Sequence, residues 1–152
     1  MFQPALFVLR YGELLLPKCI IMIDYSKRLS STYFPLSEIF KQNDKTEVLD
    51  IVYDPLKLDN MSSILHILDN LREEFGKPIY INSFYRDPYH NERVGGVNKS
   101  NHTVGAAVDI SADDYSSLYH FILHTHKNGW RILPYSKRKF LHLELLKPLK
   151  HV

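Results

Sequence analysis

The segment SNHTVGAAVD, residues 100–109, places a histidine and an aspartate seven residues apart, with Gly105 between them. The small apolar residues before Asp109 are typical of a strand that enters a hydrophobic core. An unpaired buried carboxylate is costly, so Asp109 is expected either to be exposed or to have a partner. A metal ion is one candidate partner, and His102 is close enough in sequence to share it.

A second candidate pair lies in KFLHLELL, residues 139–146. Side chains alternate across a strand, so the leucines would share the core face while His142 and Glu144 share the opposite face. With His102 and Asp109, His142 gives three ligands and leaves a fourth position for water, which is the pattern of catalytic zinc. Zinc would lower the pKa of that water toward about 7 and polarise a carbonyl. The alternative is that His102 is a loop residue and His142 an ordinary strand histidine.

Length and composition are those of one globular domain. The chain has 152 residues, of which 45% are hydrophobic and 24% charged. A chain of this length buries about 70% of its unfolded surface and needs no disulfide. The single Cys19 excludes an internal disulfide and a CxxC zinc ribbon, so a metal must be held by oxygen and imidazole ligands. The net charge of +2 is too small to indicate a nucleic-acid partner.

The first 24 residues are apolar but interrupted by Arg10, Glu13 and Lys18, and they lack a basic first segment and a small-residue cleavage site. We therefore expect no signal peptide, and no membrane span, which needs about 20 apolar residues. Two short strands, residues 7–11 and 19–24, are the expected structure. The alternative is that Met22 is the natural start and the preceding residues are incidental.

The elements that must position the candidate ligands follow from local patterns. Helices are predicted within residues 33–41 with Ser37 as N-cap, from Asp59 or Asn60 to Gly76, and within 113–129, and a short helix or turn within 87–96. Strands are predicted within residues 78–86, 105–111, 130–135 and 139–146, the last two as a hairpin. Residues 42–50, QNDKTEVLD, are interpreted as a polar connection.

Helices and strands alternate without a regular βαβ rhythm, which favours an α+β fold. We expect a small, mainly antiparallel sheet with flanking helices and a zinc site on the open face of the sheet. Residues 1–32 are expected to be an N-terminal extension or extra strands, and residues 33–152 a single domain that carries the site.

Residues 81–110, INSFYRDPYHNERVGGVNKSNHTVGAAVDI, closely resemble the signature of the M15 metallopeptidases, the zinc D-alanyl-D-alanine carboxypeptidases and related peptidoglycan endopeptidases. The shared residues are Ser83, Tyr85, Arg86, Pro88, Asn91, Val94, Gly95, Gly96, Ser100, His102, Gly105, Ala107, Asp109 and Ile110. The third zinc ligand of that family is a histidine in an aromatic-aliphatic-His strand, which matches FLH at residues 140–142. The resemblance covers residues 34–146 and implies one zinc ion held by His102, Asp109 and His142.

The resemblance also implies roles for residues around the metal. Arg86 would lie at the cleft edge and hydrogen-bond the scissile carbonyl oxygen as negative charge develops there. The alternative for Arg86 is a surface salt bridge to Asp87 or Glu92. Ser100 and Tyr85 would contact the substrate, although Ser100 equally well caps the loop that carries His102.

The sequence departs from the family pattern at the general base. Many members carry Glu or His three residues before the third ligand, where this chain has Lys139. Glu144 is the best replacement, because it shares a strand face with His142. The alternative is that Glu144 pairs with Arg86 or a lysine. Phe84 replaces the usual glycine of the signature and either narrows the cleft or fills the core.

The leading functional hypothesis is a monomeric zinc peptidase that hydrolyses peptidoglycan stem peptides, either as a D-Ala-D-Ala carboxypeptidase or as an endopeptidase. Without a recognised signal peptide, an endolysin-like, phage-type cell-wall hydrolase is expected, made in the cytoplasm and acting after release or delivery. The alternative is a non-catalytic, zinc-stabilised domain that binds the cell wall, which Lys139 favours. No nucleic-acid partner is expected.

Overall fold

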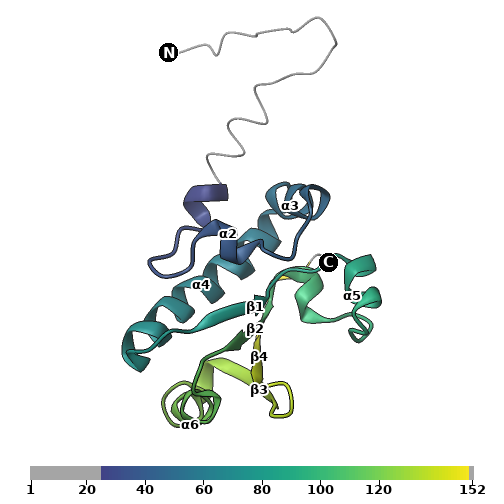
Figure 1. Cartoon of the computed structure of the whole chain (residues 1–152). Helices are drawn as coiled ribbons and strands as arrows, with labels where there is room; N and C mark the ends of the chain where they lie inside the picture. The colour runs from purple at the N-terminus through teal and green to yellow at the C-terminus, as the bar shows by residue number, and fades with distance from the viewer. Residues whose placement is uncertain (1–24, 151–152) are drawn as a thin grey trace, which may run out of the picture.

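The computed structural model describes residues 25–150. The strands predicted at residues 7–11 and 19–24 lie outside the described residues. Four strands form one antiparallel sheet in the order β1-β2-β4-β3, with β1 at Tyr80–Ser83, β2 at Ala107–Ser111, β3 at Trp130–Tyr135 and β4 at Phe140–Leu145. The predicted α+β fold and the β3–β4 hairpin are confirmed (Figure 1).

The long helix α4 (Pro55–Phe75) contributes six buried side chains to the core, more than any other element. Its N-cap is Asp54, whose carboxylate accepts from the N–H groups of Leu56 and Lys57, and Pro55 occupies the first turn. The predicted N-cap at Asp59 or Asn60 is therefore wrong by five or six residues, about one and a half turns. The predicted stop is confirmed, because Gly76 ends the helix in the left-handed conformation.

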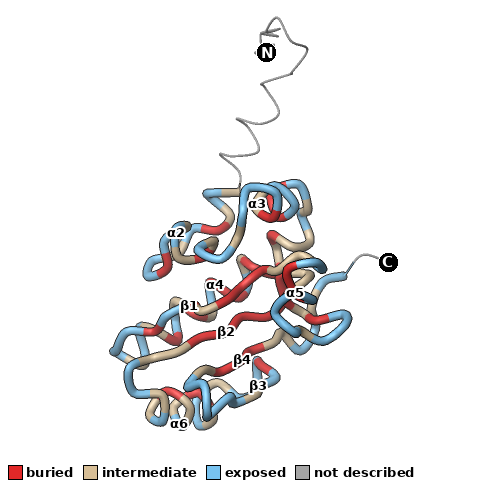
Figure 2. The backbone as a smooth tube through the Cα atoms, turned by 45° about the vertical axis from the view of Figure 1, so that its right-hand side comes forward, coloured by how far each residue is buried: buried red, intermediate tan, exposed pale blue. Residues whose placement is uncertain are grey.

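One face of the sheet packs against α4 and α6 (Tyr115–Thr125). The buried side chains that share this core are Leu58, Met61, Ile64, Leu65, Leu68 and Leu71 of α4, Val108 and Ile110 of β2, Leu141 and Leu143 of β4, and Leu118 and Ile122 of α6. Most of β2 and β4 is buried (Figure 2). The leucines of β4 take the core face as predicted, which leaves the opposite face of the central strands for the site.

The segment predicted as a polar connection contains a helix, α3 (Lys45–Val52). Asp44 and Glu47 form a reciprocal capping box at its start, in which each side chain accepts from the other residue's backbone N–H. The D-K-T-E spacing is a signature of this motif, and it outweighs the polarity of the segment. The predicted cap Ser37 is also wrong, because Pro35 precedes α2 (Leu36–Ile39) without a side-chain cap.

Two short elements border the open face of the sheet: α5 (Pro88–Arg93) and the 3₁₀ turn η1 (Asn101–Val104). A second 3₁₀ turn, η2 (Lys127–Gly129), lies between α6 and β3. Figure 1 shows α5 on the opposite side of the strands from α6. The domain boundary predicted at residue 32 stays a prediction, although Leu29 already packs in the common core. Among the described helices, none is long and apolar enough to cross a membrane.

Replacing Gly105 by alanine is expected to destabilise the fold by about 2 to 4 kcal/mol, the sum of left-handed backbone strain and overpacking. Gly105 has φ +69°, and an added Cβ would lie 2.8 Å from Cγ of Met61 and 2.9 Å from the carbonyl oxygen of Lys57. Urea unfolding measures the change. Gly129→Ala is the matched control, because no atom lies within 4 Å of its added Cβ, and equal losses in both variants would contradict the prediction.

Candidate metal centre

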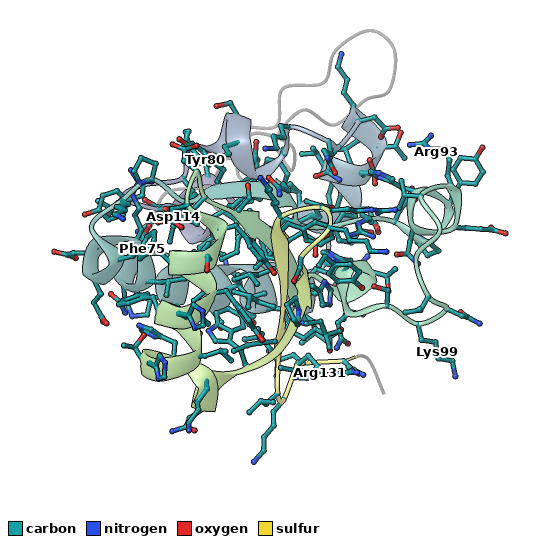
Figure 3. All side chains as sticks on the ribbon, turned by 60° about the horizontal axis from the view of Figure 1, so that its bottom comes forward. Phe75, Tyr80, Arg93, Lys99, Asp114 and Arg131 are labelled. Carbon is teal, nitrogen blue, oxygen red and sulfur yellow. The ribbon has the colours of Figure 1, made fainter. Side chains whose placement is uncertain are left out.

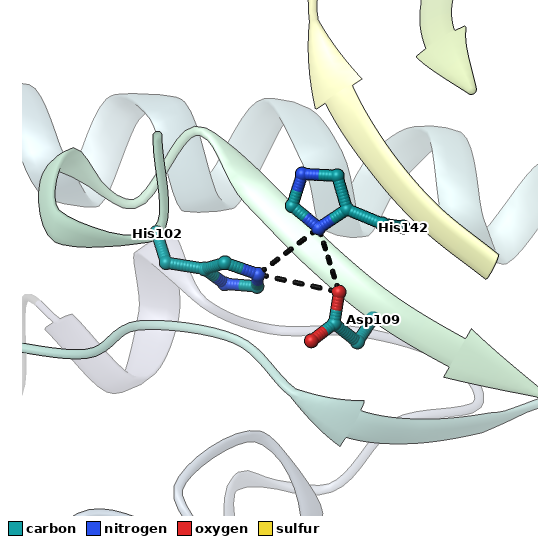
Figure 4. Close-up of side chains that lie close together, drawn as sticks. All are labelled: His102, Asp109 and His142. Atoms are coloured by element: carbon teal, nitrogen blue, oxygen red, sulfur yellow. Dashed lines mark hydrogen bonds and ion pairs between the residues drawn. The ribbon is translucent and has the colours of Figure 1, made fainter. Parts of the chain in front are cut away.

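The structure brings His102, Asp109 and His142 together on the open face of the sheet (Figure 4). Asp109 of β2 and His142 of β4 are directly paired across the antiparallel ladder, so their side chains lie next to each other on one face. His102 comes from η1, just before β2. All three residues are buried, with His102 only 1% exposed.

Local features of the chain place His102 over the sheet. The hydroxyl of Ser100 accepts a hydrogen bond from the backbone N–H of His102 at 3.3 Å and so caps η1. Gly105 ends the turn in the left-handed conformation, which turns the chain into β2. Ala106 and Ala107 are fully buried and leave room for the close packing expected from the sequence.

Three potential ligand atoms converge. Nδ1 of His142 lies 2.7 Å from Oδ1 of Asp109, and Nε2 of His102 lies 3.2 Å from each of these atoms. A tetrahedral ion with bonds of about 2.0–2.1 Å needs ligand atoms roughly 3.3–3.4 Å apart. The three atoms therefore fit a zinc-sized ion after a small opening between His142 and Asp109. Within residues 25–150, this is the group of three that could hold a metal.

The second nitrogen of each histidine is already engaged. Nδ1 of His102 donates to the carbonyl oxygen of Phe84, and Nε2 of His142 lies 2.9 Å from Oε1 of Glu144. Such partners fix the ring orientation and direct the other nitrogen at the metal. Both rings are thus oriented as metal ligands by groups of the protein itself.

Arg86 binds the second oxygen of Asp109. Its Nη2 donates to Oδ2 of Asp109 at 2.7 Å, and its Nε donates to the hydroxyl of Ser83 at 2.9 Å. The surface salt bridges to Asp87 or Glu92, considered as an alternative from the sequence, are not the pairing that forms. Oδ1 of Asp109 remains directed at the two histidines, so the carboxylate bridges Arg86 and the candidate metal site.

The pKa values of the three candidate ligands are shifted in different ways by their surroundings. Burial alone would raise the pKa of Asp109, but hydrogen bonds from His102 and His142 hold it well below its ordinary value. Burial lowers the pKa of His102, which favours a neutral ring. Burial would also lower the pKa of His142, but its hydrogen bonds to Asp109 and Glu144 outweigh burial and raise it. Of the three candidate ligands, His142 is thus the one that holds a proton most readily.

The cluster opens into a pocket of about 490 Å³. One wall comes from α5 and the loop after it, and the other from the β3–β4 hairpin. Besides the three ligands, the lining includes Gln42, Asn82, Ser83, Arg86, His90, Val94, Val97, Ser100, Arg131, Leu133, Tyr135, Arg138, Phe140 and Glu144. Arg131 lies along the β3–β4 hairpin, whereas Arg93 and Lys99 extend outward on the α5 side (Figure 3). A substrate could therefore reach the ligand atoms.

Two further predicted site residues, Ser100 and Glu144, line the pocket. Ser100 caps η1 and also lines the pocket. Glu144 lines the pocket and pairs with His142 and, at 3.3 Å, with Arg131, so its cationic partner is neither Arg86 nor a lysine. Burial would raise the pKa of Glu144, but the hydrogen bond with His142 and the nearby charges lower it.

Tyr85, predicted to contact the substrate, lies away from the pocket. Its side chain is fully buried, it does not line the pocket, and its hydroxyl donates to Asp50. From this position it fastens the loop after β1 to α3 and α4. Phe84 fills the core, which decides between the two roles considered for it. Lys139 is exposed in the hairpin turn at φ +54°, outside the pocket lining.

Sequence reasoning missed several groups around the site. The carbonyl oxygen of Phe84 holds His102, and the hydroxyl of Ser83 holds Arg86. No local sequence pattern predicts either contact. The pair of Glu47 and His90, which reaches the pocket wall, was missed because α3 was missed. The capping-box spacing at residues 44–47 was the available signal.

Comparison with known proteins adds one positive finding. The sequence model described as Peptidase M15 matches residues 32–144, which is more than half of the chain. The matched range contains the three converging side chains together with Arg86 and Glu144. Among curated proteins, none matches the chain significantly.

Proposed function

The chain belongs to the peptidase M15 family, and from that premise we propose that it is a zinc-dependent peptidase acting on the stem peptides of peptidoglycan. Hydrolysis adds one water across a peptide C–N bond and releases a carboxylate and an amine. The observation that carries the proposal is the convergence of His102, Asp109 and His142 at the floor of an open pocket.

One zinc ion would be held by Nε2 of His102, Oδ1 of Asp109 and Nδ1 of His142. When bound, zinc supplies Lewis acidity, which polarises a carbonyl and lowers the pKa of a water molecule. Three protein ligands leave a position open to the pocket, as catalytic sites require and structural sites do not. This favours a peptidase over a non-catalytic, zinc-stabilised domain that binds the cell wall.

Arg86 and Glu144 are proposed to act on the substrate. Arg86 is held by Ser83 and Asp109, while its Nη1 has only a 3.5 Å contact with Asn91. That N–H group is the one available to stabilise negative charge on the carbonyl oxygen. Glu144 is ionised and lines the pocket, so its carboxylate can accept a proton from water and pass it to the leaving amine.

We further propose that residues 33–152 form a single peptidase domain that acts as a monomer on the cell wall after release or delivery, in the manner of an endolysin. The test is a digest of purified peptidoglycan, read by mass spectrometry with and without a chelator. Loss of a terminal alanine would indicate a carboxypeptidase, and a cut within the stem or cross-bridge an endopeptidase. Products that vanish with chelator and return with zinc support the proposal, whereas a zinc-loaded protein without products favours the binding domain.

Zinc binding is expected to release close to one proton, from His142, at a pH well below the raised pKa of that residue, and about half a proton at that pKa. Asp109 and His102 release none near neutral pH, because the low pKa values of both leave the carboxylate ionised and the ring neutral. Zinc affinity should therefore fall as the pH drops below the pKa of His142, by up to about tenfold per unit. Calorimetric titration in buffers of different ionisation enthalpy counts the protons. Release of two protons at pH 6, or of none, would contradict this assignment.

A further inference from the structure

A buried ion pair outside the metal centre reaches the same pocket. Nδ1 of His90 lies 2.8 Å from Oε1 of Glu47, and the two side chains are 8% and 5% exposed. His90 belongs to α5 and Glu47 to the first turn of α3, so the pair joins two elements that are far apart in sequence. None of the roles proposed above uses it.

Glu47 is held in place from several directions. Its Oε2 accepts from the backbone N–H of Asp44 at 3.1 Å, and its Oε1 accepts from the backbone N–H of Asp87 at 3.2 Å as well as from His90. The carboxylate therefore cannot turn away without losing several hydrogen bonds. It fixes both the orientation of the His90 ring and the nitrogen that is engaged.

The other nitrogen of His90 is left for a ligand. His90 is part of the pocket lining, and Nε2 has no hydrogen-bond partner among the residues that the structure describes. Nε2 is not among the fully buried side-chain atoms that lack a partner, so it is accessible from the pocket, where water or a bound molecule can pair with it. Because Glu47 engages Nδ1, the opposite edge of the ring, with Nε2, faces the pocket.

The charges of the pocket favour an anionic ligand. Three arginines line it, against the carboxylates of Asp109 and Glu144. Arg86 pairs with Asp109 and Arg131 with Glu144, whereas Arg138 has no acidic partner within the described part of the chain. A divalent ion on the candidate ligands would add two further positive charges. A peptide that carries a free carboxylate matches this field better than a neutral peptide.

We propose that His90 determines substrate specificity by donating Nε2–H to a carboxylate of the peptide substrate, with Glu47 holding the ring from behind. This carboxylate is one that the reaction leaves unchanged. The proposal rests on the proposed function and extends it, because it selects peptides with a free carboxylate over their amidated counterparts. The competing interpretation is that the pair only fastens α3 to α5.

The test uses the zinc-loaded full chain and peptides in which each free carboxylate is replaced, one at a time, by a carboxamide. His90→Asn is the decisive variant, because its amide can still donate to Glu47 in place of Nδ1 but has no nitrogen in place of Nε2. A hydrogen bond to a charged group accounts for roughly 10- to 100-fold in binding. For one carboxylate position, wild type should prefer the acid by about this factor in kcat/KM, mostly through KM.

His90→Asn should lose that preference, with kcat/KM falling on the acid peptide and staying within about twofold on the amide. His90→Gln, whose amide nitrogen can replace Nε2, should restore part of the preference. His124→Ala, an exposed histidine on α6, is the matched control and should change neither value. Equal losses on acid and amide would mean a purely structural pair and would overturn the proposal, as would an unchanged preference.

The same comparison can be made without turnover. Calorimetric Kd values for the acid and amide peptides report the preference even if neither peptide is cleaved. An inactive wild type would count against the proposed function alone, whereas equal Kd values for every acid and amide pair would overturn the role of His90. Thermal unfolding of each variant separates a lost contact from a lost fold.

Discussion

Asp109→Asn is expected to lower kcat/KM at least about 1000-fold and to abolish tight zinc binding. The substitution keeps the shape of the side chain but removes the negative charge that lies 2.7 Å from His142 and from Arg86. An amide oxygen is a much weaker zinc ligand than a carboxylate, and the effect of the metal on the transition state is worth several kcal/mol, which corresponds to this factor. Activity assays with measured zinc content test both parts.

The same variant should also show that Asp109 is not simply a structural carboxylate. Asp113→Asn, on an exposed residue just after β2, is the matched control and should keep both zinc and activity. A stability measurement is needed beside the assay, because Asp109→Asn leaves the partly buried Arg86 without its carboxylate partner. A folded Asp109→Asn protein that keeps stoichiometric zinc and more than a tenth of the activity would rule out the proposed ligand set.

The candidate ligands were predictable because each prediction rested on a residue pattern within a single strand. Strict alternation along β4 put His142 on the face opposite the leucines, and the run of small residues predicted a buried Asp109. The pairing of these two residues followed only from the sheet register, which the sequence of one strand does not contain. The family resemblance supplied the connection that local patterns lacked.

The partners of the ligands could not be predicted for a physical reason. Phe84 holds His102 through its main-chain carbonyl, so its side chain carries no signal for that contact. Tyr85 matches the family motif, which predicts a contact with the substrate. Strand alternation, however, does not show whether an aromatic ring packs beneath a loop or points into a cleft. Its hydroxyl found Asp50 on α3, and α3 was the element that sequence reasoning missed.

The arrangement assigns more than one task to each acidic group in and around the site. Asp109 faces the histidines with one oxygen and Arg86 with the other, and Glu144 faces both His142 and Arg131. Such sharing makes the orientation of the ligands depend on neighbours in several elements. A single substitution at such a carboxylate therefore removes more than one interaction. The replacement residue must be chosen so that it keeps one interaction and removes the other.

Glu144→Gln is expected to lower kcat about 100- to 1000-fold at saturating zinc while zinc stays bound. Glutamine keeps an oxygen that can accept from Nε2 of His142, so the ring should stay oriented toward the metal. What is lost is the ability to accept a proton, and general-base catalysis typically contributes about 10²- to 10⁴-fold. Pre-steady-state or steady-state kcat, measured across a zinc titration, is the required observable.

The zinc titration separates this role from the alternative that Glu144 only orients His142. An orienting partner typically changes metal affinity by about 10- to 100-fold, so added zinc would then return kcat to the wild-type value. Arg131→Gln is the matched control, because its side chain is 63% exposed and such pairs contribute little, so kcat should stay within a few-fold. Full rescue of Glu144→Gln by zinc would leave Glu144 as a positioning residue, and the proton acceptor would then have to be sought among the other groups that line the pocket.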